Sequence, residues 1–168
     1  MDRSIKTKMD GVTIRYAEEK DIPVIFKMIK GLAVDEKATE RVFVTEEILY
    51  DSIFIKKYIE AILCEYNGRE VAFAFFFTNF SVFLGLPGIY LEALYVLPEM
   101  RGKGIGTVLL KFLSNLAVKR GCARLEWLCL DWNEAAINLY RKLGCVSLDE
   151  WTIYREAGEA LKNVADQF

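Results

Sequence analysis

The sequence predicts an α/β protein with one mixed, largely antiparallel, twisted sheet of about six to seven strands, flanked by about four helices. Three observations predict it. Strand-like and helix-like segments follow one another along the whole chain. An Asn-Gly turn at 67–68 joins two β-rich runs, and late in the chain an apolar strand leads through a glycine-rich turn into a helix. We expect a single domain over residues 1–168, with residues 1–10 as a flexible N-terminal extension.

The first third of the chain predicts one strand and two helices. Residues 12–16 alternate and form the first strand. A helix opens over residues 20–23, with Asp21 or a neighbour as its cap and proline in its first turn. Residues 35–41 are polar and predict a loop, and residues 45–49 begin a second helix.

The middle of the chain is β-rich. Residues 60–66 and 70–78 flank the Asn-Gly turn and predict a hairpin. Residues 80–87 predict a loop with exposed apolar side chains. Residues 89–97 predict an almost wholly apolar strand that carries Glu92 near its middle.

The last third predicts two helices and three strands. Residues 105–117 place apolar side chains along one face of a helix. A buried strand over 124–130 follows, and Asn133 caps a helix that runs to Leu143. Residues 145–148 and 151–155 predict two final strands.

Composition excludes several classes of function. The chain has 22 basic and 24 acidic residues and no long basic block, so we expect no nucleic-acid partner. It has no histidine, which removes Ser-His-Asp and Cys-His catalysis and most zinc sites, and we expect no metal.

The cysteines and the N-terminus predict a cytoplasmic protein. Cys64, Cys122, Cys129 and Cys145 form no CxxC pair and lie in or beside apolar segments, as buried reduced thiols do. The N-terminus has no apolar core of a secretory signal. The longest apolar run, 71–77, is far too short to cross a membrane, so we expect no membrane contact.

Residues 101–106 read RGKGIG and lie between the predicted strand and helix. This order is typical of an anion site, because the first N–H groups of a helix have no internal partner and glycine lets an anion come close. The spacing fits neither a P-loop nor a Rossmann turn. A tight connection with no ligand is the alternative.

The pattern Arg101-x-x-Gly104-x-Gly106 resembles the pyrophosphate-binding motif of the GNAT acetyltransferase superfamily. Residues 133–140 match the family's later Asn-x-x-Ala-x-x-x-Tyr signature. The resemblance spans roughly residues 12–155. It implies a GNAT-like sheet with splayed central strands, acetyl-CoA as donor and coenzyme A as product. Within the superfamily the chain is most similar to spermidine/spermine and thialysine acetyltransferases, which are homodimers.

The resemblance also implies which residues bind the cofactor. They belong to the strand before the glycine turn, to the turn and helix start, and to the later signature: Leu94, Tyr95, Val96, Arg101, Gly102, Lys103, Gly104, Ile105, Gly106, Thr107, Asn133 and Tyr140.

Acetyl transfer to an amine needs a base, because a lysine-like amine has a pKa of about 10.4 and must lose a proton before it attacks. Glu92, flanked by apolar residues, is the candidate base, and we expect it to be desolvated. It acts directly or through water; the alternative is a solvated side chain. Tyr140 is the candidate acid for the leaving thiolate, against a tyrosine that only packs.

Glu36 and Glu92 are the candidate acceptor-binding residues, with Asp35 beside the first. Diamine acetyltransferases commonly have an acid where this chain has Ala93, so we expect a small primary amine: a diamine, a polyamine or a thialysine-like amino acid. The alternatives are a protein N-terminus or lysine as acceptor, and a noncatalytic acyl-CoA-binding module.

Overall fold

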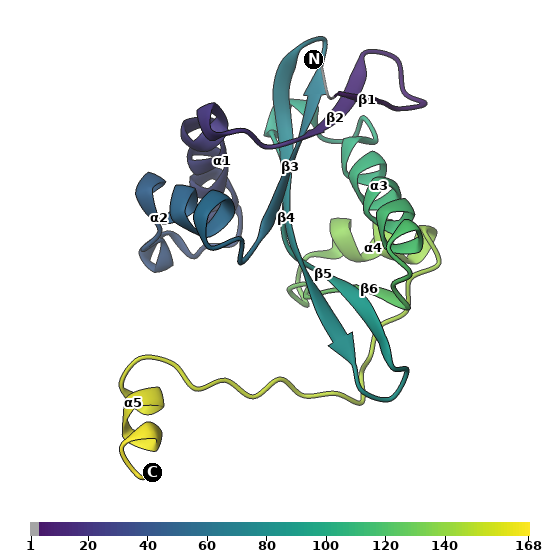
Figure 1. Ribbon diagram of the computed structural model, residues 1–168. Helices are drawn as coiled ribbons and strands as arrows, with labels where there is room; N and C mark the ends of the chain where they lie inside the picture. The colour runs from purple at the N-terminus through teal and green to yellow at the C-terminus, as the bar shows by residue number, and fades with distance from the viewer. Residues whose placement is uncertain (1–3) are drawn as a thin grey trace. The chain divides into compact units, whose positions relative to one another are not determined.

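A computed structural model describes residues 4–168 (Figure 1). It divides into two compact parts, residues 4–128 and residues 129–168, which are described one at a time. The first part holds the sheet and three of the helices.

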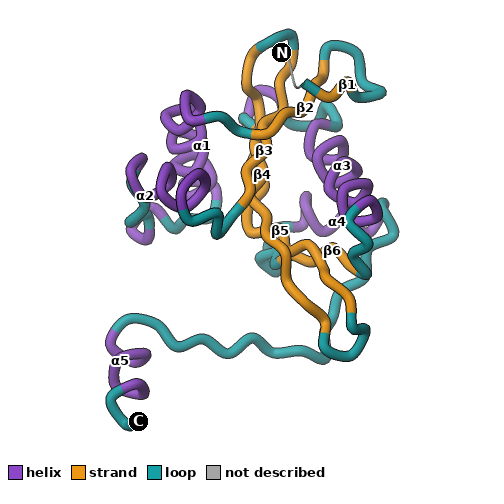
Figure 2. The backbone as a smooth tube through the Cα atoms, viewed as in Figure 1, coloured by secondary structure: helices purple, strands orange, loops and turns teal. Residues whose placement is uncertain are grey.

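One sheet of six strands forms the centre of the first part (Figure 2). Its spatial order is also its sequence order: β1 (Ile5–Lys6), β2 (Val12–Tyr16), β3 (Glu60–Tyr66), β4 (Arg69–Ser81), β5 (Leu86–Val96) and β6 (Arg124–Trp127). Neighbours are antiparallel except β5 and β6, which are parallel. The prediction of a mixed, mostly antiparallel sheet is confirmed.

Helices cover both faces of this sheet. In Figure 1, α1 and α2 lie on one face and α3 on the other. A π-helical turn, Asp51–Ile55, continues α2, and short 3₁₀ turns occur at Glu19–Asp21, Thr39–Arg41 and Pro98–Met100. The α-helices of residues 4–168 are α1 (Ile22–Asp35), α2 (Glu46–Tyr50), α3 (Ile105–Lys119), α4 (Glu134–Lys142) and α5 (Glu159–Ala165).

The core on the α1 side depends on aromatic side chains of β4 and β5. Phe73, Phe75 and Tyr95 pack with Ile25 and Met28 of α1. Each of these side chains is less than 10% exposed. Burial of a large apolar side chain stabilises a fold by about 1.5–3 kcal/mol, so this cluster fixes α1 over the middle of the sheet.

A buried ion-pair network holds the entry to α1. Arg15 of β2 contacts Asp21 at 2.5 Å and Glu65 of β3 at 2.6 Å. The Asp21 carboxylate also accepts the N–H of Glu18, so it caps the short turn before α1 rather than α1 itself. Although burial works in the opposite direction, these hydrogen bonds hold the pKa of Asp21 below its usual value.

Two predicted boundaries in the first part are wrong. Residues 80–87 are not a simple loop, because β4 and β5 remain paired up to Ser81 and Leu86 and only a tight turn joins them. The predicted strand 124–130 ends at Trp127. Residues 1–3 lie outside the described residues, and Ile5–Lys6 pairs with β2. The flexible extension over residues 1–10 stays a prediction.

The second part contains less regular structure than the sequence predicts. Residues 145–148 and 151–155 form no strands, and α5 was not expected. A strand must satisfy its backbone groups on a neighbouring edge. Among residues 4–168 these two segments have no such pairing, so their β-propensity alone does not make strands.

Candidate active site

A β-bulge interrupts β5 at Glu92. Phe75 of β4 pairs with Ala93 and the next residue, Phe76, pairs with Leu91, so Glu92 is an extra residue without a partner on β4. The pairing of β5 with β6 also ends here, at Leu91 opposite Trp127. From Glu92 to Val96, β5 therefore has β4 on one edge and no strand on the other among the described residues. This is the splay that the family resemblance implies.

The open edge of β5 presents backbone N–H groups. Leu97 N–H donates to Val71 O of β4 at 2.9 Å. Backbone groups alternate between the two edges of a strand, so Tyr95 also faces β4, and the N–H groups of Leu94 and Val96 face the open edge. The carbonyl of Val96 agrees with this direction, because it accepts a hydrogen bond from the Arg101 side chain at 2.9 Å.

The glycine loop ends in an uncapped helix start. Gly102 and Gly104 have φ of 73° and 88°, a left-handed conformation that favours glycine. Gly104 is the N-cap of α3 and has no side chain to accept the first N–H groups of the helix. Gly106 lies inside α3, with Ile105 buried before it and Thr107 half-buried after it. The loop can therefore donate several N–H groups to an anion.

The two basic side chains of the loop contact other parts of the protein. Arg101 donates to Val96 O and to the carboxylate of Asp35 at the end of α1. Lys103 is exposed, and its Nζ lies 3.7 Å from Met100 Sδ. The guanidinium is thus directed toward α1, while the phosphate role of both residues stays a prediction.

Glu92 is exposed, so the expectation of a desolvated carboxylate is wrong. The bulge explains it, because the extra residue is released from the strand ladder that buries Leu91 and Tyr95. The alternative of a solvated side chain agrees with this exposure.

Acidic groups gather at the C-terminal end of α1. Glu36 is the C-cap residue of α1, and its pKa is raised by burial and by the neighbouring Asp35. The end of a helix also carries partial negative charge, so this end of α1 favours a cation. Ala93 packs against the core below α1 and offers no charge.

In the second part, α4 presents Asn133 and Tyr140 on one helix face, because seven residues make about two turns. Asn133 Oδ1 accepts from Ala136 N–H at 3.2 Å, which confirms its capping role. Tyr140 is half-buried. Their cofactor roles stay predictions.

The model of the acetyltransferase (GNAT) family matches residues 26–145. The chain belongs to this family. It is 33% identical to a thialysine N-epsilon-acetyltransferase of Mus musculus, over 94% of this chain and 99% of that protein. It is 28% identical to an L-ornithine N5-acetyltransferase of Arabidopsis thaliana, over 90% of this chain and 86% of that protein.

A solved aminoglycoside N-acetyltransferase in complex with CoA shares the fold. It has a TM-score of 0.70 and 17% identity, and covers 92% of this chain and 100% of that chain. The family model and the thialysine acetyltransferase relative show that the chain is a GNAT N-acetyltransferase, so the predicted enzyme class is confirmed.

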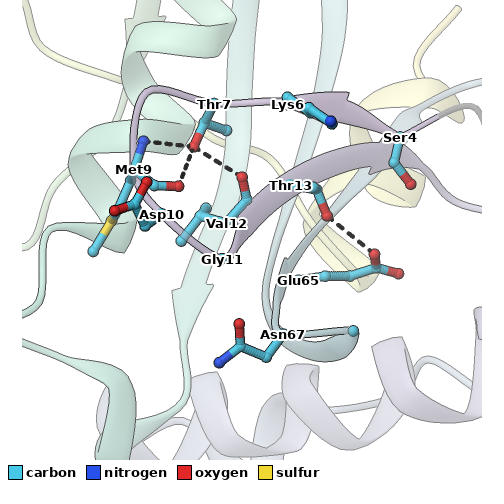
Figure 3. A pocket seen from close by; sticks show the side chains of 11 residues that line it. Ser4, Lys6, Thr7, Met9, Asp10, Gly11, Val12, Thr13, Glu65 and Asn67 are labelled. Carbon is cyan, nitrogen blue, oxygen red and sulfur yellow. Dashed lines mark hydrogen bonds between the residues drawn. The ribbon is translucent and has the colours of Figure 1, made fainter.

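A hollow lies at the other edge of this acetyltransferase sheet (Figure 3). It is lined by the turn before β2 and the turn after β3, with a volume of about 490 Å³. Side chains that line it form hydrogen bonds with other lining residues: Thr7 Oγ1 donates to Val12 O at 2.9 Å, and Thr13 Oγ1 donates to Glu65 at 3.2 Å. Since the sheet order places it beyond β3, it lies away from the open edge of β5.

Within residues 4–168, no group of three or more Cys, Asp or Glu side chains could hold a metal ion. No helix in that range is long and apolar enough to cross a membrane.

Proposed function

We propose that this protein transfers the acetyl group of acetyl-CoA to a small primary amine, directly and within one ternary complex. The bulge at Glu92 carries the proposal. It opens β5 at the point from which the same strand leads into the glycine loop. Backbone N–H groups that can bind the acyl oxygen are thus followed, along one segment, by N–H groups that can bind a phosphate.

The donor site is proposed from backbone groups. Loop residues 101–107 hold the pyrophosphate through their N–H groups, with Arg101 contributing its main chain. The outward N–H groups of Leu94 and Val96 meet the thioester oxygen as it gains negative charge. Hydrogen bonds of this kind need no side chain, which fits the apolar sequence of this strand.

Two side chains would move protons. Glu92 takes a proton from the acceptor ammonium through a water molecule, which its exposure allows. The amine nitrogen then bonds to the acetyl carbon, and the carbon–sulfur bond breaks. Tyr140 gives its phenolic proton to the leaving thiolate, and Asn133, on the same face of α4, holds the pantetheine or a water.

The acceptor is proposed to be a diamine, a polyamine or a thialysine-like amino acid. Glu36 at the end of α1 and Glu92 at the bulge are acids suited to ammonium groups. Burial and the neighbouring Asp35 raise the pKa of Glu36. A bound ammonium group would lower it again, because it stabilises the charged carboxylate. The named relatives that act on thialysine and ornithine support an acceptor of this size.

We also propose that the chain is one domain and forms a homodimer. The tip of the β4–β5 arm exposes apolar side chains, and Phe83 is 92% exposed. A second copy could cover such a patch. Size-exclusion chromatography with light scattering tests this, and a monomer at all concentrations would refute it. The cytoplasmic location stays a prediction from the cysteine pattern.

The test of the activity is direct. The protein is incubated with acetyl-CoA and, one at a time, with thialysine, ornithine, spermidine and lysine. Free thiol is followed and the acetylated product identified by mass. We expect turnover with at least one of them. Tight binding of CoA without turnover of any amine would contradict the proposal and favour a binding module.

A further inference from the structure

We propose that Arg101 is a positioning residue: its side chain ties the glycine loop and the open edge of β5 to the C-terminal end of α1. The assignment of the loop and β5 to the donor, and of the end of α1 to the acceptor, rests on the proposed function. The tie itself rests on contacts within residues 4–128.

The guanidinium makes three contacts with two elements, β5 and α1. Nε donates to Val96 O at 2.9 Å, at the open edge of β5. Nη2 donates to the carboxylate of Asp35, the last residue of α1. The guanidinium carbon lies 5.3 Å from the centre of the Tyr95 ring. A planar group with several fixed donors can make these contacts together, and an ammonium cannot.

These contacts extend the region in which α1 packs against β5. A Cβ on Gly31 would lie 2.7 Å from Cζ of Tyr95, so α1 approaches this strand only because residue 31 is glycine. Asp35 follows one turn later on the same face of α1. The Arg101–Asp35 pair therefore extends the contact from Tyr95 to the end of the helix.

The pair cannot matter much for stability. The side chains of Arg101 and Asp35 are 43% and 38% exposed, and ion pairs at such positions contribute roughly 0–1 kcal/mol. What the pair fixes is geometry. Glu36 follows Asp35 directly, so a shift of this end of α1 moves the acceptor acid relative to Val96 and the loop.

The geometry implies a coupling between the two substrates. A donor bound at the loop orders Arg101 and with it the end of α1, and the acceptor then binds more favourably. By linkage, the acceptor strengthens donor binding by the same factor. A phosphate ligand, the role first expected for Arg101, would give no special dependence on Asp35.

Three variants separate these roles: Arg101→Lys, Asp35→Asn and the double variant. We expect each single change to raise the acceptor KM about fivefold or more, with CoA affinity without acceptor changed far less. We expect the double variant to be no worse than either single one, because both changes break one contact. Arg69→Lys is the control, since Arg69 forms a comparably exposed pair with Glu99 at 2.9 Å.

A different pattern would overturn the proposal. A phosphate-binding Arg101 predicts that lysine largely preserves CoA affinity, that Arg101→Ala loses it, and that Asp35→Asn is silent.

A measurement that needs no catalysis distinguishes a failure of this proposal from a failure of the proposed function. Amide exchange at Glu36 and Ala38, whose N–H groups bond to Leu32 O and Ala33 O at 2.9 and 2.8 Å, should quicken equally in both single variants. Unchanged exchange would refute the tie even if acetylation is found. Faster exchange in a protein that acetylates no amine would retain the tie and refute the activity.

Discussion

The two halves of β5 have the same neighbour on one side and opposite surroundings on the other. From Gly88 to Leu91 the strand lies between β4 and β6, and both edges are satisfied. From Glu92 to Val96 only β4 remains. One extra residue separates a structural half from a half that can bind a ligand through its backbone.

The feature proposed to bind the donor is the edge of a strand rather than a cluster of side chains. In the closed half, Ile89 is fully buried and Leu91 nearly so. In the open half, Leu94 and Val96 are just as apolar, yet their N–H groups face away from β4.

Glu92→Gln should have the largest effect, because it removes the proposed base and keeps the bulge. We expect kcat to fall by about 100-fold or more with little change in CoA affinity. Steady-state kinetics and calorimetry measure both. Glu99→Gln, an exposed acid beyond the open half, should leave kcat unchanged; equal losses in both variants would remove the base role.

Tyr140→Phe should lower kcat less. Solvent can also protonate a thiolate, so we expect a loss on the order of tenfold to a hundredfold. Tyr154→Phe is the matched control in the same part of the chain, at a side chain that is 92% exposed. A large loss of CoA binding in Tyr140→Phe would show a binding role in place of the acid role.

Gly104→Ala tests the loop that continues the open half. Alanine at φ of 88° is strained by about 1–2 kcal/mol, so the loop should change conformation and CoA affinity should fall about tenfold. Gly121→Ala places the same strain at the other end of α3, where φ is 67°. It should lower the melting temperature similarly and leave CoA affinity intact; equal affinities in both variants would contradict the role of the loop.

Asp21→Asn should change stability and leave the site unaffected. Arg15 retains Glu65 and Glu70, so we expect a loss of about 1–3 kcal/mol in the free energy of unfolding. Asp51→Asn, at an exposed pair with Lys56, should cost less than about 1 kcal/mol. Urea unfolding measures both.

The effect of Asp21 depends on pH in a known direction. Its pKa is lowered in the folded protein, so its stabilisation is complete above the unfolded pKa of about 3.9 and is lost as pH falls through the folded value. The difference in the free energy of unfolding between the native protein and Asp21→Asn should therefore become smaller on acidification below about pH 4. A difference that grows would refute the assignment.

The sequence predicted what depends on local patterns. The Asn-Gly hairpin, the α3 stripe and the Asn133 cap leave signals within a few residues, and each is confirmed. The glycine spacing predicted the loop for the same reason, because the positive φ of Gly104 is a property of that one residue and favours glycine there.

What the sequence could not predict depends on pairing between distant segments. The bulge at Glu92 exists only as a register shift against β4, and no residue type marks it. The exposure of Glu92 follows from that shift. The Arg101–Asp35 contact joins residues 66 positions apart, and nothing in RGKGIG indicates that its arginine turns toward α1.

The most direct test is a residue-by-residue NMR titration with CoA. The open half of β5 should respond and the closed half should not: amide signals of Leu94 and Val96 should shift and become protected from exchange, while those of Ile89 and Leu91 stay unchanged. Loop amides from Gly102 to Thr107 should shift with the same affinity. Equal responses in both halves, or none at Leu94 and Val96 while CoA binds, would contradict the account.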